Sequence, residues 1–524
     1  MGDYLNPSND GFEESINSKI YVDKTGLISY TNKIIRTQQK YICISRPRRF
    51  GKTMAANMLT AYYSSGCNSD GLFAGFSISR DSSYKKHLNK YHVIFLNIQH
   101  FLSEGDNVKA MIKEIEKDIF EEALEAHPEL AAIISKKKLT AFLQKLYTST
   151  KTPIIFIIDE WDCIFRENQN DKTAQKIYLD FLRNLLKDRQ YVALAYMTGI
   201  LPIKKYGTHS ALNMFREFSM TDPRELAEFV GFTQNEVKGL CKVFKLNFEE
   251  MARWYDGYYF SGLRSVYNPK SVVEALLSKH FSDYWSQTET FEALSFYIKI
   301  NFNGLKDTIV ELLTGEKRRI NISNFSNDMV TFKSYEDVLT LLIHLGYLGY
   351  EFETQEVFIP NKEISDEFVT AIRDAGWEEI ISAINASDEL LQAVWRGDSK
   401  IVEQCVEKAH NETSILTYNN ENALAYVISL AFFNARQYYN ITREMPAGKG
   451  FADLVFLPRK NHMDKPAMIV ELKWDETATS AIEQIENKMY AEIFRDYRDN
   501  ALLVGINYDK GTKRHECVIK KLLQ

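Results

Sequence analysis

The residues that most constrain the fold of this chain are Ser-Arg-Pro-Arg-Arg-Phe-Gly-Lys-Thr-Met at positions 45–54. The short apolar run YICIS (41–45) leads into them, and the sequence AANMLTAYY (55–63) follows them. A strand, a loop with Gly-Lys-Thr and a helix together bind phosphate, because the N–H groups that begin the helix point at the anion. The sequence therefore predicts a phosphate-binding loop. The alternative is an ordinary strand–helix turn with basic surface residues.

Individual residues of this loop have expected roles in binding a nucleotide. Lys52 would reach the β- and γ-phosphates, and Thr53 would coordinate Mg²⁺. Arg49 and Gly51 complete the expected nucleotide-binding residues of the loop. The general motif places glycine where this chain has Arg46. Phosphate binding explains the basic cluster of the loop more simply than DNA binding does; the cluster consists of Arg46, Arg48, Arg49 and Lys52.

Two other strand ends carry polar residues that suit nucleotide chemistry. The run IIFII (154–158) ends in Asp159 and Glu160. Asp159 would hold Mg²⁺, and Glu160 would polarise an attacking water. A third run, VALAYM (192–197), ends in Thr198, which would sense the γ-phosphate. The alternatives are a helix N-cap with acidic first-turn residues at 159–160 and a simple turn at 198.

The first half of the chain alternates strand and helix patterns. Apolar runs at 41–45, 93–98, 154–158 and 192–197 suit strands that are buried on both faces. An apolar stripe over 107–124 predicts one of the intervening helices. Such alternation predicts an α/β domain with a parallel sheet.

Beyond this domain the pattern becomes mostly helical and then changes again. Asp222 and Thr233 are the expected N-caps of two helices. The last part opens with a helix pattern and continues with three strand-like runs. We expect a nucleotide-binding domain at 1–215, a helical lid at 216–290, a mostly helical connector at 291–410 and an α/β domain at 411–524.

Several strings of the first half together resemble the AAA-ATPase-like family of bacteria and archaea. They are YVDKT (21–25), SRPRRFGKT, DEWD, TGILPIKK, WYDGYYF (254–260) and VYNPKSV (266–272). RPRRFGK[ST] is the loop pattern of this family, so Arg46 departs only from the general motif. The resemblance implies a P-loop NTPase sheet that binds ATP with Mg²⁺. It also places Asp23 and Lys24 near the nucleotide and makes 255–258 a packed turn.

The C-terminal third contains a second candidate site. Asp453 follows Phe-Ala in one strand-like run, and Glu471 and Lys473 lie in another, MIVELKW. Residues two apart on a strand point to the same face. Two carboxylates suit Mg²⁺ or Mn²⁺, which activate water and stabilise charge on a phosphodiester, while Lys473 would assist the attack. The alternative is a solvated edge strand with a salt bridge.

This D…ExK pattern resembles the PD-(D/E)XK nucleases, and the AAA-ATPase-like family commonly carries a C-terminal domain of this type. Phe451 and Ala452 precede Asp453, so the proline of the family name is missing. The resemblance implies a restriction-endonuclease-like α/β fold, with Glu421 as a further metal ligand. It also implies a helix over 481–490 that presents Gln484 to the site, with Lys488 on the same face.

Composition limits the remaining function classes. With 45% hydrophobic and 26% charged residues, the chain is an ordinary folded protein. Its 64 basic and 70 acidic residues give a net charge of −6, which argues against nonspecific nucleic-acid binding as the main activity. No run of about 18 apolar residues occurs, so we expect no membrane association. Six scattered cysteines without CxxC spacing indicate a reducing cytoplasm and no zinc site.

The sequence thus predicts an ATPase fused to a metal-dependent nuclease that cuts nucleic acid, DNA in preference to RNA. Nucleotide binding would gate the nuclease or order a homo-oligomer. The family resemblance is also consistent with defence against foreign DNA. The rival hypothesis is a nucleotide-dependent switch or interaction protein whose C-terminal domain binds a partner without cutting.

Overall fold

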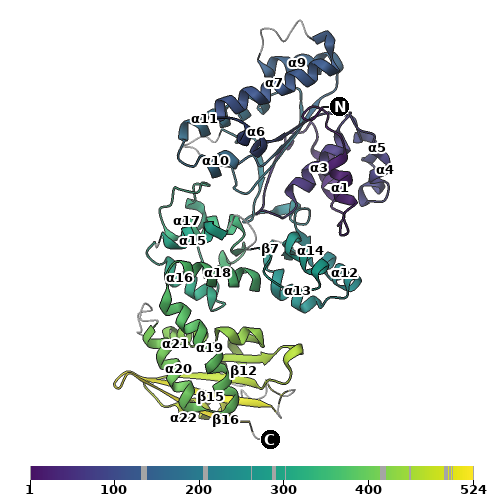
Figure 1. Cartoon of the computed structure of the whole chain (residues 1–524). Helices are drawn as coiled ribbons and strands as arrows, with labels where there is room; N and C mark the ends of the chain where they lie inside the picture. Colours follow the sequence, from purple (N-terminus) through teal and green to yellow (C-terminus); the bar gives the residue numbers. More distant parts are fainter. Residues whose placement is uncertain are drawn as a thin grey trace. The chain divides into compact units, whose positions relative to one another are not determined.

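The computed structural model of the chain describes residues 2–130, 138–203, 211–260, 263–285, 291–300, 302–412, 421–447, 450–488, 494, 497 and 500–522. The chain forms two compact units (Figure 1). The first comprises Met1–Glu289 and Arg319–Asp366, and the second comprises Thr290–Arg318 and Glu367–Gln524. The expected connector at 291–410 thus contributes to both units, and the four expected domain ranges remain a prediction.

The first unit is built on a parallel five-stranded sheet with the order β2-β3-β4-β1-β5. The four strands that the apolar runs predict are all present, with ends that differ by one or two residues. The short strand β5 was not predicted. The strands are β1 (Tyr41–Ser45), β2 (His92–Asn97), β3 (Ile154–Asp159), β4 (Val192–Gly199) and β5 (Arg216–Phe218).

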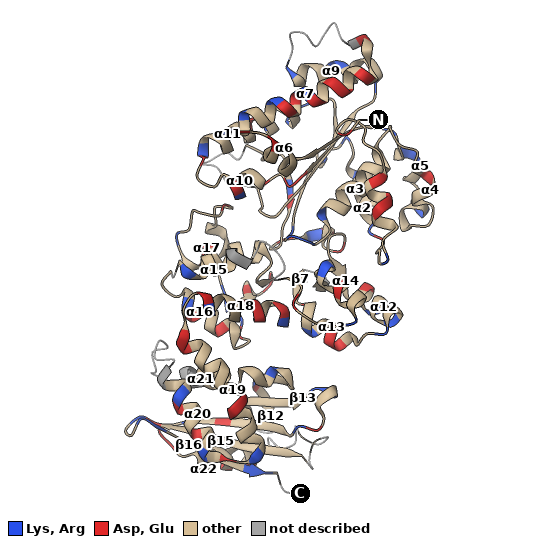
Figure 2. Ribbon diagram, viewed as in Figure 1, with Lys and Arg blue, Asp and Glu red and all other residues tan. Residues whose placement is uncertain are grey.

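Helices cover both faces of this sheet. Figure 1 shows α1, α3, α4 and α5 on one side and α6, α7, α9 and α11 on the other. Figure 2 shows acidic and basic residues interspersed along α7. The helices are α1 (Asp10–Ile16), α2 (Gly26–Ile34), α3 (Lys52–Tyr63), α4 (Asp70–Phe73), α5 (Tyr84–His87), α6 (Ile98–Glu104), α7 (Val108–Ala126), α9 (Leu139–Thr150), α10 (Cys163–Glu167) and α11 (Lys172–Leu186).

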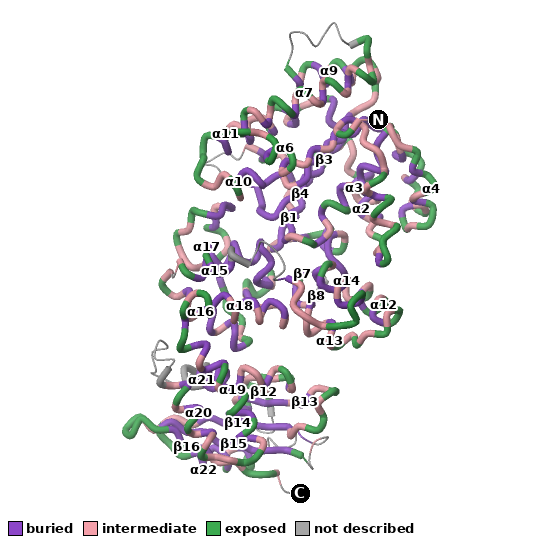
Figure 3. Tube along the Cα trace, viewed as in Figure 1, coloured by how far each residue is buried: buried purple, intermediate pink, exposed green. Residues whose placement is uncertain are grey.

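Because helices cover both faces, the central strands have no exposed side. Every residue of β1, β3 and β4 is buried (Figure 3). The stripe of α7 that faces inward includes Val108, Ile115, Ile119 and Ala123, as the 3.6-residue period predicts. Met111 completes it, whereas the predicted Ile112 is only half-buried.

One side chain of α7 holds the N-terminal segment. The carboxylate of Glu122 accepts hydrogen bonds from the backbone N–H groups of Asp3 (2.8 Å), Tyr4 (3.0 Å) and Leu5 (2.7 Å). Leu5 also forms an isolated bridge with Ile94 of β2. The N-terminal segment is therefore fastened to both a helix and a strand of the first unit.

The predicted lid region folds as three helices and a small antiparallel sheet within the first unit. Thr233 begins α12 with a capping box, because its N–H donates to Glu236 Oε2 at 2.7 Å. The expected helix after Asp222 is absent; only a short 3₁₀ turn at Arg224–Leu226 forms. The elements are α12 (Gln234–Phe244), α13 (Phe248–Tyr255), α14 (Pro269–Ser278), β6 (Phe232–Thr233), β7 (Tyr258–Phe260) and β8 (Leu263–Tyr267).

The expected packed turn at 255–258 is present and depends on glycine. Gly257 has φ +112°, and a Cβ there would lie 2.1 Å from the carbonyl oxygen of Pro360. Asp256 accepts a hydrogen bond from the N–H of Gly257 at 2.7 Å. Between residues 318 and 374 the chain forms β9 (Arg318–Arg319), α17 (Tyr335–Leu345), β10 (Gly349–Glu351), β11 (Glu356–Phe358) and α18 (Lys362–Asp374).

The second unit contains a mixed five-stranded sheet with the order β12-β13-β14-β15-β16. Strands β14 and β15 are parallel, and the other neighbours are antiparallel. Three of these strands were predicted, whereas β12 and β16 at the two edges were not. The strands are β12 (Tyr439–Ala447), β13 (Gly450–Pro458), β14 (Ala467–Trp474), β15 (Ala501–Asp509) and β16 (Arg514–Lys521).

Helix α22 (Ala478–Asn487) packs against β14 and β15 and begins three residues earlier than predicted. Apolar side chains from this helix and from the sheet, including Ile469, Ile482 and Leu503, form a buried core. None of the helices in the described part of the chain has the length and apolar content of a membrane span. The other helices of this unit are α15 (Phe291–Lys299), α16 (Leu305–Leu313), α19 (Glu378–Arg396), α20 (Ser399–Glu412) and α21 (Glu421–Ala431).

Candidate functional sites

The predicted phosphate loop connects the end of β1 to the start of α3. Because β1, β3 and β4 are parallel, their carboxyl ends meet at one edge of the sheet, where the loop lies. Gly51 precedes the helix with φ +90°, and Arg49 also has a positive φ of 68°. The first turn of α3 thus carries unpaired backbone N–H groups and the positive end of the helix dipole.

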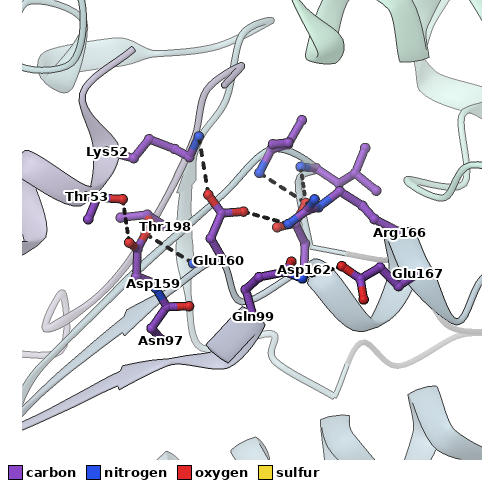
Figure 4. A network of polar contacts seen from close by, with 12 residues as sticks. Lys52, Thr53, Asn97, Gln99, Asp159, Glu160, Asp162, Arg166, Glu167 and Thr198 are labelled. Atoms are coloured by element: carbon purple, nitrogen blue, oxygen red, sulfur yellow. Dashed lines mark hydrogen bonds and ion pairs between the residues drawn. The ribbon is translucent and has the colours of Figure 1, made fainter. Parts of the chain in front are cut away.

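Lys52 bridges this loop to the end of β3. Its Nζ donates to the carbonyl oxygen of Pro47 at 3.0 Å. The same atom lies 3.8 Å from Glu160 Oε1 (Figure 4). Burial lowers the pKa of Lys52, and the negative charges of Glu160 and Asp159 oppose that shift. Burial likewise raises the pKa of Glu160, against the charge of Lys52. A bound phosphate is also an anion, so it would compete with Glu160 for the ammonium group of Lys52.

Asp159 gathers two of the other predicted residues. Its Oδ2 accepts a hydrogen bond from Thr53 Oγ1 at 2.7 Å, and its Oδ1 accepts one from Thr198 Oγ1. Asp159 and Thr198 are fully buried. The structure therefore brings together the hydroxyl and the carboxylate that the sequence assigns to Mg²⁺. Both are the hard oxygen ligands that Mg²⁺ prefers, so this donor set fits the ion.

Two charged residues behind Glu160 were not predicted. Arg166 of α10 donates to Glu160 Oε2 at 2.6 Å, and its Nε lies 3.4 Å from Asp162 Oδ2. Asp162 also accepts hydrogen bonds from the N–H groups of Ile200 (3.1 Å) and Leu201 (2.8 Å), which follow β4. The only sequence signal was the four-residue spacing of Asp162 and Arg166, which is also common on helix surfaces.

A cavity of about 930 Å³ opens beside the loop. Its polar lining includes Arg49, Gly51, Lys52, Thr53 and Glu160. Its apolar lining includes Ile20, Tyr21, Val22, Phe229, Phe232, Pro269 and Val273. A cavity lined by both charged and apolar groups suits a ligand that combines phosphates with a flat ring.

Asp23 and Lys24, which the resemblance placed near the nucleotide, have different positions. Lys24 lines the cavity, but its Nζ is bound to Glu236 at 2.7 Å and to the carbonyl oxygen of Glu228. Asp23 instead accepts hydrogen bonds from Thr25 (2.9 Å to its N–H) and from the N–H of Ser77 (2.8 Å). Asp23 therefore links the segment before α2 to Ser77 and does not line the cavity.

Arg46 is not part of the phosphate-binding cluster that was expected. Its side chain is fully buried and lies outside the cavity lining, whereas Arg48, Arg49 and Lys52 line the cavity. Its Nη1 donates to the carbonyl oxygen of Phe218 at 3.0 Å, and its guanidinium lies 4.9 Å from the ring centroid of Phe260.

The predicted carboxylate–lysine site of the second unit forms where β13 and β14 lie side by side. Asp453 Oδ2 accepts a hydrogen bond from the N–H of Leu472 at 2.7 Å, and the N–H of Asp453 lies 3.5 Å from Glu471 Oε2. Gln484 of α22 donates to Glu471 Oε1 and accepts a hydrogen bond from Lys473 Nζ at 2.7 Å. Asp453, Glu471, Lys473 and Gln484 are therefore clustered, as predicted.

The electrostatics of this cluster favour a cation. Glu471 is buried, and both burial and the negative charge of Asp453 raise its pKa to about 8. Lys473 and Lys488 oppose this shift. A divalent ion would relieve the repulsion between the two carboxylates. Within the described residues no group of three or more His, Cys, Asp or Glu side chains could hold a metal. Two carboxylates with water nevertheless suit Mg²⁺, which retains several waters.

Glu421, the remaining predicted metal ligand, begins α21, and its side chain lies outside the described part of the structure. Lys488 caps the C-terminal end of α22, where its backbone N–H donates to the carbonyl oxygen of Gln484. Phe451, at the start of β13, is 62% exposed.

Comparison with known families identifies the two domains that carry these candidate sites. Residues 10–208 match the family described as "Predicted AAA-ATPase", and residues 419–517 match the "PD-(D/E)XK nuclease superfamily". The chain therefore carries an AAA-ATPase-like domain followed by a C-terminal domain of the PD-(D/E)XK nuclease superfamily. The α/β fold class is confirmed, with a parallel sheet typical of P-loop NTPases in the first domain and a mixed sheet in the last. No curated protein matches the sequence.

Solved structures with some similarity include a Walker-type ATPase of Pyrococcus abyssi. It is 12% identical in sequence, and the match covers 66% of this chain and 94% of the Pyrococcus chain, with a TM-score of 0.34. The ORC2 protein of Aeropyrum pernix is 12% identical over 69% of this chain and 97% of its own, with a TM-score of 0.30. PCH-2 of C. elegans is 15% identical over 47% of this chain and 52% of the PCH-2 chain, with a TM-score of 0.22.

Proposed function

We propose that the first domain binds ATP with Mg²⁺ in the cavity beside the phosphate loop. Lys52 would leave Glu160 and bind the β- and γ-phosphates, while the N–H groups of α3 and Gly51 surround them. Arg49 would add positive charge, and Thr53 with Asp159 would hold Mg²⁺. The apolar residues that line the cavity would receive the adenine ring. The observation that supports this proposal is the Thr53–Asp159 pair next to Lys52.

Hydrolysis would then depend on Glu160 and Thr198. Once Lys52 turns to the phosphates, Glu160 would retain only Arg166 as its ionic partner and would be able to polarise a water. Thr198, at the end of β4, donates a hydrogen bond to Asp159, as Thr53 does. It would sense whether the γ-phosphate is present. This division gives binding and hydrolysis separate residues, so the two steps can be separated by substitution.

The second part of the proposal concerns the C-terminal domain, which would be a metal-dependent nuclease. Asp453 and Glu471 would hold Mg²⁺ or Mn²⁺, which would supply the activated water and stabilise charge on the phosphodiester. Lys473 would position the water or neutralise the developing charge, and Gln484 would orient Lys473. The supporting observation is the contact of Gln484 with both Lys473 and Glu471. DNA is the preferred substrate of this proposal over RNA.

A nuclease assay tests this function directly. Plasmid, linear and single-stranded DNA, and RNA, would be incubated with the full chain and Mg²⁺ or Mn²⁺, with and without ATP. Metal-dependent cutting that is lost in Asp453→Ala supports the nuclease. A change in rate with ATP supports gating by nucleotide, with light scattering to follow any homo-oligomer. The absence of cutting in a folded protein that binds ATP would refute the nuclease.

The alternative is a nucleotide-dependent switch with a non-cleaving C-terminal domain, and one observation favours it. Gln484 already satisfies both Glu471 and Lys473, and Glu471 would be largely protonated at neutral pH without a metal. Such a site would be stable without substrate or metal. Under this alternative, Mn²⁺ would not bind at the carboxylates, which titration of Mn²⁺ into wild type and Asp453→Ala would reveal.

A further inference from the structure

An exposed aromatic ring lies on the strand that carries Asp453. Phe451 is 62% exposed, whereas Ala452 and Leu454 are buried. Because side chains alternate along a strand, Phe451 and Asp453 point to the same face of β13. A single exposed apolar residue needs no special explanation on a protein surface. This ring is of interest because it lies on the same strand as Asp453 of the candidate site.

The end of the β13–β14 pairing relates the ring to the site. Leu454 and Val470 are the last paired residues of the two strands. Beyond them Asp453 stays beside β14, because it accepts a hydrogen bond from the N–H of Leu472 and its own N–H lies 3.5 Å from Glu471 Oε2. Phe451 precedes Asp453 by two residues and lies on the same face of β13, so its exposed ring follows the site along the strand.

The spacing on this surface fits a nucleic-acid strand. Two residues along a strand correspond to about 6.6–6.8 Å, which is the separation expected between Phe451 and Asp453 along β13. A phosphate at the carboxylates would then have its neighbouring base within reach of the ring. Lys473, which lies two residues after Glu471 on β14, provides positive charge for the same nucleic-acid strand.

We propose that Phe451 stacks on a nucleobase next to the scissile phosphate, so that the C-terminal domain acts on nucleic acid with an unpaired base there. Aromatic stacking needs an accessible face of the base, and in an intact duplex the neighbouring base pairs cover it. The substrate is therefore a single strand or an opened end, in preference to a continuous duplex. Stacking tolerates any base, so little sequence preference follows from this contact. This inference rests on the proposed nuclease function.

Binding to the full chain tests the inference separately from cutting. In the Asp453→Asn background, a fluorescein-labelled 20-nucleotide oligo(dT) and a 20-base-pair duplex would be titrated with protein in Mg²⁺. Phe451→Ala should weaken single-strand binding by about fivefold or more, because stacking is worth about 1–3 kcal/mol per base. Phe451→Trp should retain binding, Phe451→Leu should lose most of it, and duplex binding should not change. A labelled RNA of the same length shows whether the sugar matters.

The matched control is Phe352→Ala, because Phe352 is 53% exposed and lies in the first unit. It should leave single-strand binding unchanged. Equal binding by Phe451→Ala and its parent, or an equal loss for duplex and single strand, would overturn the inference. A change in oligomeric state on light scattering would do so too, since the ring would then contact protein. If the wild type cuts nothing, the nuclease proposal fails, yet this binding comparison still gives its own answer.

Discussion

The ammonium group of Lys52 lies 3.8 Å from the carboxylate of Glu160, and the two side chains are 4% and 21% exposed. The residue proposed to bind phosphates is thus paired with the residue proposed to activate water. A nucleotide must separate this pair before either residue takes its role. Binding and catalysis should therefore respond differently to the two substitutions.

Lys52→Ala should weaken ATP binding by about tenfold to a hundredfold, because a hydrogen bond to a charged group is worth about 1.5–3 kcal/mol. Titration calorimetry with ATP and Mg²⁺ measures this. Lys85→Ala is the matched control, since Lys85 belongs to the same unit, is 68% exposed and does not line the cavity. Unchanged affinity in Lys52→Ala would contradict the proposed site.

Glu160→Gln should retain ATP binding and lower the rate of hydrolysis by about 10²–10⁴-fold, as expected for removal of a general base. Gln keeps the shape of Glu and removes its negative charge. Because Lys52 then has no ion pair with residue 160 to break, it would bind phosphates more readily. Phosphate release at saturating ATP provides the measurement. A variant that hydrolyses ATP at the wild-type rate would exclude Glu160 as the base.

Metal binding at the C-terminal site should become tighter as pH rises. Glu471 has a pKa of about 8 in the metal-free protein, so below that pH a metal must displace its proton. Mn²⁺ binding followed by electron paramagnetic resonance at pH 6.5 and 8.5 should show higher affinity at the higher pH. Glu471→Gln, which lacks one of the two carboxylates, should bind Mn²⁺ weakly at both pH values. Equal affinity at both values in wild type would refute the assignment.

The same carboxyl group should make the stability of the metal-free protein depend on pH. The pKa of Glu471 is raised from 4.5 to about 8 on folding, so its protonated form is the one that folding favours. Its contribution is full below pH 4.5 and is lost as pH rises toward 8. Urea unfolding of wild type and Glu471→Gln between pH 5 and 8 should show a steeper fall in wild type, since burial also raises the pKa of Glu363 to about 8 in both proteins. Saturating Mg²⁺ should offset the additional fall of wild type.

Gln484→Ala should slow cleavage by about tenfold or more without raising KM, because Lys473 and Glu471 lose the amide that both contact. Single-turnover cleavage measured over a range of concentrations up to saturation separates the maximal rate from KM. Glu483→Ala is the control, since Glu483 is the exposed neighbour on the same helix. A purely higher KM in Gln484→Ala would indicate a substrate contact instead of an orienting role.

Sequence patterns predicted the buried parts of the fold better than its edges. The run IIFII of β3 is apolar at every position because helices cover both faces of the sheet, and this makes such strands easy to find. Strand β16 reads RHECVIKK and pairs on one side only, with β15, so it has no such run. Asp222 looked like an N-cap, yet its carboxylate binds the Arg224 side chain two residues on, and only a 3₁₀ turn follows.

The candidate sites show the same limit. Lys52, Thr53 and Asp159 could be predicted because each follows or precedes a recognisable strand or helix. Arg166 could not, because its contact with Glu160 depends on where α10 lies after the chain has turned. The spacing of Gln484 on its helix was visible in the sequence. Its simultaneous contact with Glu471 and Lys473 is a property of the packing of α22 on β14.

Arg46 occupies the position at which phosphate loops generally carry glycine, and its side chain leaves the loop on the side away from the cavity. Its backbone is not among the left-handed residues of the described chain. The guanidinium is accommodated there because it donates to the carbonyl oxygen of Phe218 and lies 4.9 Å from the ring centroid of Phe260. Glycine is therefore not needed at this position for the loop to connect β1 to α3. A motif search that demands glycine at this spacing would miss this chain.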